Sequence, residues 1–350
     1  MSDHLRVVQW ATGNIGLKSL RGIIEHPAMT LAGLYVYDPD KVGQDAGRLC
    51  GLDSVGVSAT NRIKDVLALD ADCVLYMPRT FDVDDVCLLL ESGANVVTTA
   101  GLLHHPPSMD PATRTRIEDA CTAGGTSIHS TGSSPGFISE AVPLVLTSIQ
   151  RRLDKLDIDE YADLSKRDSP ELLFDIMGFG RELAPFHQAR ADHLRSSFGP
   201  SLRLVADAVG LPLDDVTAKG ELAATPRETH IAAGTLKAGT VAAQRITVSG
   251  VRRGRELITF RANWYCTTDL EPAWELRDTG WRVAVHGDAP LDVELRMPVP
   301  LDQMAETSPG YTANRAVNLV AAVCAAPPGI LSTLDLPHAL AVIGRRTGSP

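Results

Sequence analysis

The sequence lacks several features that mark common classes of protein. Its six cysteines, at positions 50, 73, 87, 121, 266 and 324, include no C-x-x-C pair. This spacing excludes a zinc knuckle and a redox dithiol, and it favours a reduced, cytoplasmic location. Arg6 and Gln9 interrupt the first apolar run, and Pro327 and Pro328 interrupt the last. We therefore expect no secretory signal, no transmembrane segment and no membrane partner.

The chain also lacks an excess of positive charge. It has 33 Lys and Arg against 43 Asp and Glu, a formal charge of −10, and its basic residues are scattered. We therefore expect no nucleic-acid partner. Hydrophobic residues make up 44% of the composition and charged residues 22%, which excludes a disordered chain. A length of 350 residues favours two domains.

Short β-branched runs alternate with helical stretches in the first third of the chain. The expected strands are 5–10, 30–37, 72–78, 94–99 and 125–131, and the expected helices between them include 13–26, 83–93 and 111–125. This rhythm is typical of parallel βαβ units, so the N-terminal part is predicted to be an α/β Rossmann domain.

The pattern changes after about residue 154. Strand-like alternation dominates 215–300, and 241–267 is a hairpin candidate with Gly250 and Gly254 at its turn. Residues 171–199 are predicted to be helical. We expect an α+β substrate and dimerisation domain over 136–310, built on an open, mainly antiparallel sheet. The Rossmann domain is then 1–135, completed by a helical return over 311–350.

The stretch WATGNIG after the first strand carries part of a dinucleotide-binding pattern. Gly13 and Gly16 occupy its second and third glycine positions, while Ala11 stands at the first. The second glycine lets the backbone approach a diphosphate, and the third lets helix and strand pack closely. We expect Ala11 to be tolerated with a negative φ, and the helix beginning near Asn14 to hold the diphosphate on its free N–H groups.

The second strand leads to Asp38, about where a ribose-binding acid is expected. A carboxylate there favours NAD, because it accepts the ribose hydroxyls and repels a 2′-phosphate. Lys41 lies close enough in sequence to offset that repulsion. The sequence therefore leaves both NAD and NADP open as cofactors, and Asp38 is equally consistent with a polar turn.

Seven stretches along nearly the whole chain resemble a known family. They are WATGNIG, VYDPDKVGQDAG, YMPRT, NVVTTAG, TGSSPGF, IMGFGRE and GYTANRAVN, in that order. The chain is similar to the dihydrodipicolinate reductase-like family, in the branch with 2,4-diaminopentanoate dehydrogenase and the native amine dehydrogenases. This resemblance implies an NAD(P)-dependent oxidoreductase, usually a homodimer, with its active site in a cleft between the two domains.

The resemblance also implies cofactor contacts. The family's cofactor motifs correspond to Gly13, Asn14, Ile15 and Gly16 for the diphosphate, and to Pro78 and Arg79 after the third strand. They also correspond to Thr98, Thr99 and Ala100 beside the nicotinamide. All of them follow predicted strand ends, where ligands of open α/β sheets bind. Asn314, on the return helix, is a further candidate for the nicotinamide side, with a capping or solvent-facing role as its alternative.

One departure from the family concerns proton transfer. The amine dehydrogenase members carry T-T-C-E-E after the fourth strand, whereas this chain continues from Thr98 and Thr99 to Ala100, Gly101 and Leu102. A carboxylate there deprotonates ammonium and stabilises an iminium. His104 and His105 follow shortly afterwards, and His105 is our candidate from this segment for supplying a proton, with a turn role as its alternative.

A second departure is at the start of the substrate domain. Dihydrodipicolinate reductase carries E-x-H-H-x-x-K-x-D-A-P there, and residues 160–170 keep its Glu, Lys, Asp and Pro without the paired histidines. Lys166 is therefore a candidate for protonation and anion binding, and Asp163 for the missing acid. Each is also consistent with a solvated turn. No pair of histidines has ligand spacing, so we expect no metal.

We predict hydride transfer to or from a carbon bound to nitrogen or oxygen, with a small amine, imine or carbonyl compound as substrate. The resemblance implies that amine or imine chemistry comes first. The missing glutamate keeps two alternatives open. One is an imine or ketone reductase without ammonia activation, and the other is a catalytically silent NAD(P)H-sensing protein.

Overall fold

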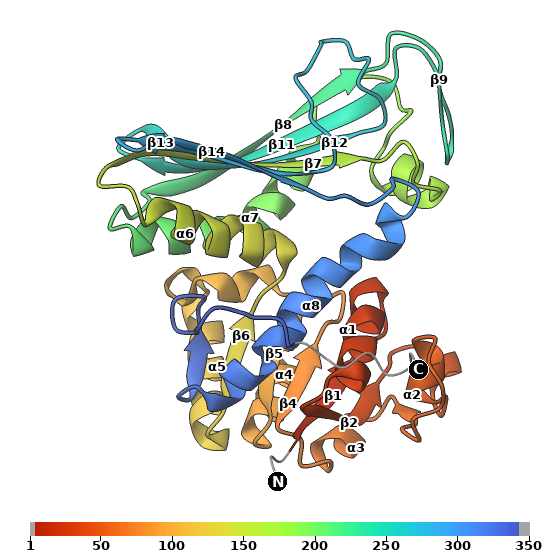
Figure 1. Ribbon diagram of the computed structural model, residues 1–350, viewed down its shortest axis with the longest axis vertical. Helices are drawn as coiled ribbons and strands as arrows, with labels where there is room; N and C mark the ends of the chain where they lie inside the picture. Colours follow the sequence, from red (N-terminus) through yellow and green to blue (C-terminus); the bar gives the residue numbers. More distant parts are fainter. Residues whose placement is uncertain (1–3, 343–350) are drawn as a thin grey trace, which may run out of the picture. The chain divides into compact units, whose positions relative to one another are not determined.

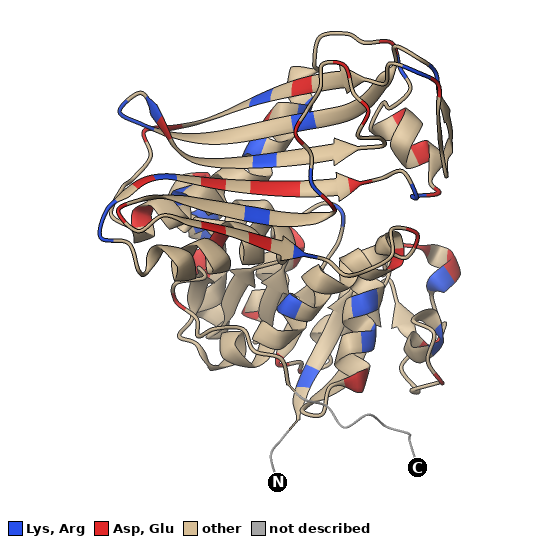
Figure 2. Ribbon diagram, turned by 45° about the horizontal axis from the view of Figure 1, so that its top comes forward, with Lys and Arg blue, Asp and Glu red and all other residues tan. Residues whose placement is uncertain are grey.

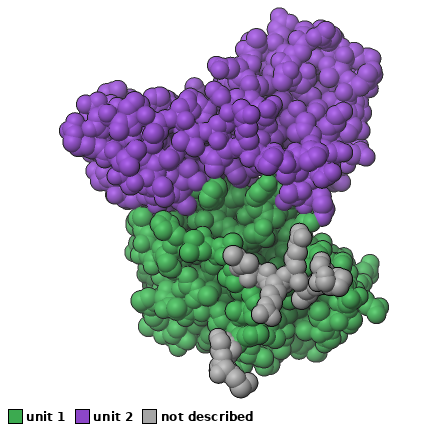
Figure 3. Space-filling model, viewed as in Figure 1, with its two compact units in different colours: residues 1–137, 308–350 green, residues 138–307 purple. Residues whose placement is uncertain are grey.

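The structure, a computed structural model, describes residues 4–342 and divides into two compact units. Within the described residues, unit 1 takes 4–137 and 308–342, and unit 2 takes 138–307 (Figure 3). Residues 343–350 of the expected helical return lie outside the described residues.

Unit 1 is built on a seven-stranded parallel sheet with the order β15-β6-β5-β4-β1-β2-β3 (Figure 1). Its strands are β1 (Leu5–Trp10), β2 (Met29–Tyr35), β3 (Ala59–Thr60), β4 (Cys73–Tyr76), β5 (Asn95–Thr98), β6 (Ser127–Ser130) and β15 (Gly329–Leu331). The strand order reverses between β1 and β4, so a ligand is expected at the carboxyl ends beside this point.

Helices cover both faces of this sheet. One face packs against α1 (Asn14–Glu25), α2 (Ala46–Leu49) and α8 (Met304–Ala325). The other face packs against α3 (Ile63–Leu67), α4 (Val83–Glu91) and α5 (Pro111–Gly124). Neighbouring strand residues contribute to opposite cores, for example Val7 to the first and Val8 to the second. The predicted Rossmann architecture of the N-terminal part is confirmed.

The C-terminal segment contributes a strand as well as a helix. Residues Gly329–Leu331 pair in parallel with β6 and form one edge of the sheet. The sequence predicted only a helical return here, because three residues after two prolines are too few to show a strand pattern.

Unit 2 is built on a six-stranded sheet with the order β14-β13-β7-β12-β11-β8 (Figure 1). Its strands are β7 (Leu153–Asp163), β8 (Asp215–Ala224), β11 (Val241–Arg252), β12 (Arg255–Tyr265), β13 (Gly280–Gly287) and β14 (Leu291–Arg296). Only the β7–β12 pair is parallel, so the predicted open, mainly antiparallel sheet is confirmed. A separate two-stranded ribbon pairs β9 (Thr229–Ile231) with β10 (Gly234–Leu236).

The two faces of this sheet differ. Helix α7 (Gln188–Ala208) packs on one face, where Phe198 stacks on Phe260 with ring centroids 3.8 Å apart. Helix α6 (Val142–Thr147) precedes β7 in the chain. Side chains alternate between the two faces along each strand, so Asp159 and Arg261 lie on the other face, which we call the open face. Figure 2 shows acidic and basic residues interspersed along these strands.

The predicted helix over 171–199 is wrong in its middle. A short helical segment covers Glu171–Ile176, and α7 begins only at Gln188. Gly178 and Gly180 between them have φ of 77° and 74°, left-handed values that end a helix. Among residues 4–342, no helix combines the length and apolar character needed to cross a membrane.

Candidate functional site

The turn after β1 differs from the sequence prediction at Ala11. We expected a negative φ, but Ala11 has a φ of 75°, in the left-handed region that favours glycine. The backbone therefore keeps the bend that the family's first glycine permits, and an alanine carries it. Such a conformation costs a residue other than glycine about 1–2 kcal/mol, so the surrounding structure must hold it.

Gln9 is the residue that holds this turn. Its side chain is fully buried, and its Nε2 donates to the Ala11 carbonyl at 3.0 Å and to the Trp10 carbonyl at 3.1 Å. Its Oε1 accepts from Ser19 Oγ of α1 at 2.6 Å. The amide thus ties the turn to the helix that follows it. A buried glutamine within an apolar strand was the sequence signal for this role.

The start of α1 has the properties that a diphosphate site needs. Gly13 precedes the helix, no side chain caps its first turn, and that turn holds no acidic residue. A Cβ on Gly16 would lie 2.3 Å from the Ala11 carbonyl oxygen, so only glycine permits this close packing of helix and turn. An added Cβ on Gly13, by contrast, would meet nothing within 4 Å, so the space beside Gly13 at the start of the helix is open. The residues fit a dinucleotide on the N–H groups of Asn14, Ile15 and Gly16.

The end of β2 brings Lys41 back to this turn. Asp38 is exposed and caps a short helix (Pro39–Lys41) by accepting from Asp40 N at 3.0 Å. Lys41 Nζ donates to Thr12 Oγ1 at 3.2 Å, which places its ammonium beside the glycine turn. Lys41 therefore flanks the turn, and Thr12 is a contact that sequence reasoning missed.

The end of β4 lies beside β1. Met77 N donates to the Trp10 carbonyl at 3.1 Å and continues the strand pairing toward Pro78, which is partly buried, and Arg79, which is exposed. Trp10 Nε1 donates to Tyr37 Oη at 3.0 Å, and the Tyr37 side chain is 53% exposed. An exposed aromatic ring therefore stands at the same edge as the glycine turn.

The ends of β5 and β6 are joined by hydrogen bonds. Thr131 N donates to the Thr98 carbonyl at 2.9 Å, and Ser130 Oγ donates to the Ala100 carbonyl at 2.7 Å. Thr98 is buried, and Thr99 and Ala100 are partly buried. Ser130 therefore fixes the backbone at Ala100, directly before the two positions where the family glutamates are missing.

The two histidines after this strand are buried. His104 ends a short helix over Gly101–His104, and its Nε2 lies 3.5 Å from Ser130 Oγ. His105 is 6% exposed, and its carbonyl accepts from Ser108 Oγ at 3.1 Å. Both therefore lie at the carboxyl edge of the unit 1 sheet, inside the protein rather than in a solvated turn.

Helix α8 adds two polar residues to this edge. Thr312 Oγ1 lies 2.7 Å from Ser133 Oγ, and Arg315 Nε donates to Thr131 Oγ1 at 2.9 Å. Asn314, the predicted contact on the same helix, is exposed. The hydroxyl of Ser134, in the same segment, is buried without a hydrogen-bond partner among the described residues. A buried donor of this kind fits a polar ligand group.

The other catalytic candidates lie in unit 2, at the end of β7. Asp163 is the last residue of the strand, and its Oδ1 accepts from Ser165 N at 2.8 Å. Burial raises the pKa of the Cys266 thiol to about 12, and the charge of Asp163 contributes to this increase. Lys166 is exposed and follows the strand rather than lying on it. Among residues 4–342, no group of three or more potential ligand side chains could hold a metal ion.

Residues 137–348 match the family model described as the 2,4-diaminopentanoate dehydrogenase C-terminal domain. The chain belongs to this family. It is 29% identical to an amine dehydrogenase from Streptomyces virginiae, over 98% of this chain and 99% of that one. It is 24% identical to 2,4-diaminopentanoate dehydrogenase from Acetoanaerobium sticklandii, over 81% of this chain and 77% of that one.

Solved structures show the same fold. An amine dehydrogenase from Mycobacterium smegmatis superposes with a TM-score of 0.74, at 19% identity over 97% of each chain. A second structure, a putative oxidoreductase from Magnetospirillum magnetotacticum, gives a TM-score of 0.53 at 17% identity, over 94% of this chain and 95% of that one. The predicted family branch is confirmed, and this family member is an oxidoreductase.

Proposed function

We propose that this chain is an NAD(P)-dependent amine dehydrogenase. The observation that carries the proposal is the turn from Ala11 to Gly16, which combines a glycine-like bend at Ala11, an uncapped helix start and a Gly16 that admits no side chain. Its position at the carboxyl edge of a parallel sheet supports a dinucleotide. The relative from Streptomyces virginiae, which spans nearly the whole chain, supports an amine as substrate.

The proposed reaction requires a hydride transfer and a proton transfer. When bound, the nicotinamide accepts or supplies the hydride. In oxidation, that hydride leaves the carbon that bears the nitrogen with its electron pair, and a proton leaves the nitrogen, so a base must lie within hydrogen-bond reach. The cofactor's reactive carbon is proposed to lie beside Thr98, Thr99 and Ala100. The predicted position of the substrate, between the two domains, stays a prediction.

Three side chains are our candidates for the proton. His105 is buried at the edge of unit 1, whereas Asp163 and Lys166 lie at the end of β7 in unit 2. Asp163 also caps the following turn, so a structural role competes with the chemical one. Their variants separate the roles, because a proton-transfer residue changes kcat and its pH profile while cofactor affinity is kept.

The test has two parts. Titration of the purified chain with NADH and NADPH, followed by cofactor fluorescence, should show saturable binding, and a panel of primary amines with NAD+ and NADP+ should show turnover. Variants His105→Gln, Asp163→Asn and Lys166→Ala should then include one with a large fall in kcat and unchanged cofactor binding. Binding without turnover of any amine, imine, ketone or aldehyde would instead support a sensing protein.

One observation favours a second candidate function. The segment after β5 holds Gly101 and Leu102 where the amine dehydrogenase members carry glutamates, so no carboxylate activates ammonia there. A reductase acting on a preformed imine or a ketone needs only a proton donor. Turnover of cyclic imines or ketones with no dependence on ammonium would support this alternative. The expected homodimer also stays a prediction, checked by light scattering against the chain mass of 37.4 kDa.

A further inference from the structure

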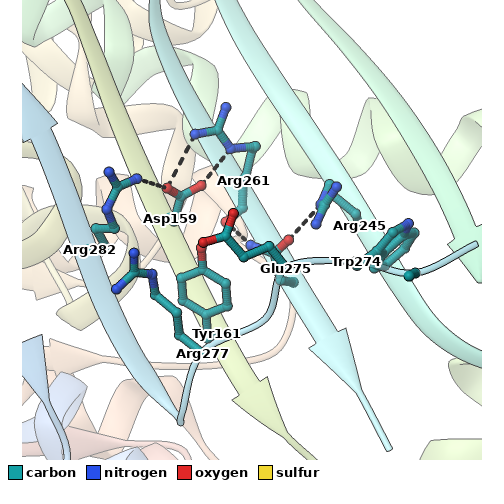
Figure 4. A pocket seen from close by; sticks show the side chains of 10 residues that line it. Asp159, Tyr161, Arg245, Arg261, Trp274, Glu275, Arg277 and Arg282 are labelled. Carbon is teal, nitrogen blue, oxygen red and sulfur yellow. Dashed lines mark hydrogen bonds and ion pairs between the residues drawn. The ribbon is translucent and has the colours of Figure 1, made fainter. Parts of the chain in front are cut away.

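Unit 2 carries a pocket of about 390 Å³ on the open face of its sheet. It is lined by Asp159, Tyr161, Arg245, Arg261, Asn263, Ala273, Trp274, Glu275, Arg277 and Arg282, all within this unit. The strands β7, β11, β12 and β13 form its floor, and the loop after β12 contributes residues 273–277 to its wall. In Figure 4 the four arginines lie around Glu275 and Tyr161.

Three of the four guanidinium groups are already neutralised. Asp159, whose side chain is 3% exposed, pairs with Arg261 at 2.5 Å and with Arg282 at 3.3 Å. Arg282 also pairs with Asp292 at 2.6 Å, and Arg277 pairs with Glu294 at 3.2 Å. These ion pairs fix the floor of the pocket, and their charges need no ligand.

Arg245 is different. Its guanidinium stacks over the Trp274 ring at 4.4 Å, and its Nε donates to the neutral amide oxygen of Asn263 at 2.7 Å. Asn263 is 2% exposed and is held in turn by the Glu160 carbonyl at 3.1 Å. Arg245 forms no ion pair within residues 4–342, although Glu221 lies opposite it in the strand register. The stacking orients the guanidinium and leaves its outer N–H groups for an anion.

Glu275 supplies an opposite charge and forms no ion pair with the residues from 4 to 342. It lines the same pocket from the loop, whereas in the described part of the chain Arg277 pairs with Glu294 and Arg245 contacts Asn263 and Trp274. Tyr161, which is 8% exposed, lines the space between strands and loop. The pocket therefore offers one oriented cationic group and one separate anionic group, beside an aromatic wall.

We propose that this pocket binds a small amino acid as its zwitterion. The carboxylate pairs with the outer N–H groups of Arg245, and the ammonium group lies beside Glu275. A guanidinium binds a carboxylate in a two-point geometry that a lysine does not reproduce. The volume suits a ligand of this size, since small-molecule sites begin at about 300 Å³. This inference does not depend on the proposed redox function, because none of the lining residues belongs to the cofactor-binding edge.

Ligands that vary the spacing of the two charges test the assignment. Glycine, β-alanine and 4-aminobutyrate are titrated into the full chain by calorimetry, with acetate and ethylamine as half-ligands, in the absence of cofactor. We expect one of the three zwitterions to bind at least about tenfold more tightly than either half-ligand. No saturable binding of any zwitterion up to about 50 mM would overturn the proposal.

Two variants locate the charges. Arg245→Gln should abolish binding, and Glu275→Gln should lower the zwitterion affinity to that of acetate while leaving acetate binding unchanged. Arg255→Gln, at an exposed arginine of the β11–β12 hairpin, and Glu271→Gln, at an exposed glutamate in the same loop, are the matched controls. An unchanged zwitterion affinity in either pocket variant would overturn the proposal.

A folding defect in the arginine variant does not weaken this test. Glu275 is exposed on a loop, so its substitution leaves the fold intact and its effect is decisive by itself. Arg245→Lys keeps the charge but loses the two-point geometry, so we expect an affinity at least about fivefold lower with an unchanged melting temperature. Equal affinity in this variant would contradict the assigned carboxylate geometry.

Discussion

At the scale of single residues, the turn after β1 depends on a conformation that its own residue disfavours. Ala11 has a φ of 75°, and the Gln9 amide donates to its carbonyl. The hydrogen bonds of Gln9 to Trp10, Ala11 and Ser19 offset the local strain. Activity of the proposed cofactor site therefore depends on residues that do not themselves contact the cofactor.

Substitutions at Ala11 test this account. A β-branched residue is strained at a positive φ, so Ala11→Val should lower the free energy of unfolding by about 2 kcal/mol and weaken NAD(P)H binding. Ala11→Gly should stay within about 1 kcal/mol of the parent, since glycine adopts this φ freely. Urea denaturation and cofactor fluorescence measure both effects. Equal stability of the valine and glycine variants would show that the backbone is not strained there.

Lys41 is the residue most directly placed to influence the choice between the two cofactors. Its ammonium group lies 3.2 Å from Thr12 Oγ1, next to the turn that is proposed to hold the diphosphate. We expect Lys41→Ala to weaken NADPH binding about tenfold and NADH binding less than about threefold, because only NADPH carries a 2′-phosphate. Lys64→Ala, at an exposed lysine of α3, is the control. Equal losses for both cofactors would exclude a 2′-phosphate contact.

At the scale of elements, a single carboxylate organises the loop that follows β2. Asp45 caps α2 by accepting from Gly47 N and Arg48 N, and it also accepts from Ser54, Val55 and Gly56. Desolvation raises the pKa of this carboxyl, but the hydrogen bonds outweigh it and lower the pKa from 3.8 to about 2. The loop from 50 to 58 is thus tied to the ionised form of one side chain.

This depressed pKa gives a pH-dependent stability. Ionised Asp45 stabilises the folded state above the unfolded pKa of 3.8, and this contribution is lost as the pH falls toward the folded pKa of about 2. Melting temperatures measured from pH 5 to pH 2 should therefore fall less steeply in Asp45→Asn than in the parent, from a lower starting value. Asp40→Asn, at an exposed aspartate nearby, should follow the parent curve. Parallel curves for the parent and Asp45→Asn would contradict the assignment.

At the scale of the whole molecule, unit 1 is assembled from both ends of the chain. The first core of its sheet includes Ala316, Val317, Val320 and Val323 of α8, together with Leu331 of β15. These side chains cover residues of β1 and α1, such as Val7 and Leu20. Unit 2, by contrast, is one continuous segment.

Fragments should reflect this difference. A fragment of residues 138–307 should unfold cooperatively by itself, whereas 1–137 should not, because its sheet lacks α8 and an edge strand. Addition of a peptide of residues 304–342 to the 1–137 fragment should restore a cooperative thermal transition, which circular dichroism measures. A cooperative transition of 1–137 alone would show that the C-terminal segment is dispensable for this fold.

Local sequence patterns were enough to predict the regular parts of the fold. Strand β1 and helices α1, α4 and α5 follow from local periodicity and caps, and their bounds agree with the prediction to within two residues. Glycine spacing also identified the turn at Gly13 and Gly16. At Gly16 the close approach of the Ala11 backbone leaves no room for a side chain. The second strand ends at Tyr35, two residues before the expected end.

Tertiary structure decided what local patterns do not encode. The left-handed Ala11 accepts a hydrogen bond from a buried amide two residues away, and β15 forms by pairing with β6 at the edge of the sheet. Lys41 meets Thr12 and Arg315 meets Thr131 across 29 and 184 residues of sequence. The arginine pocket likewise gathers four strands and a loop of unit 2. Periodicity reports which face of an element is buried, whereas the partners of polar side chains are fixed only when distant segments pack.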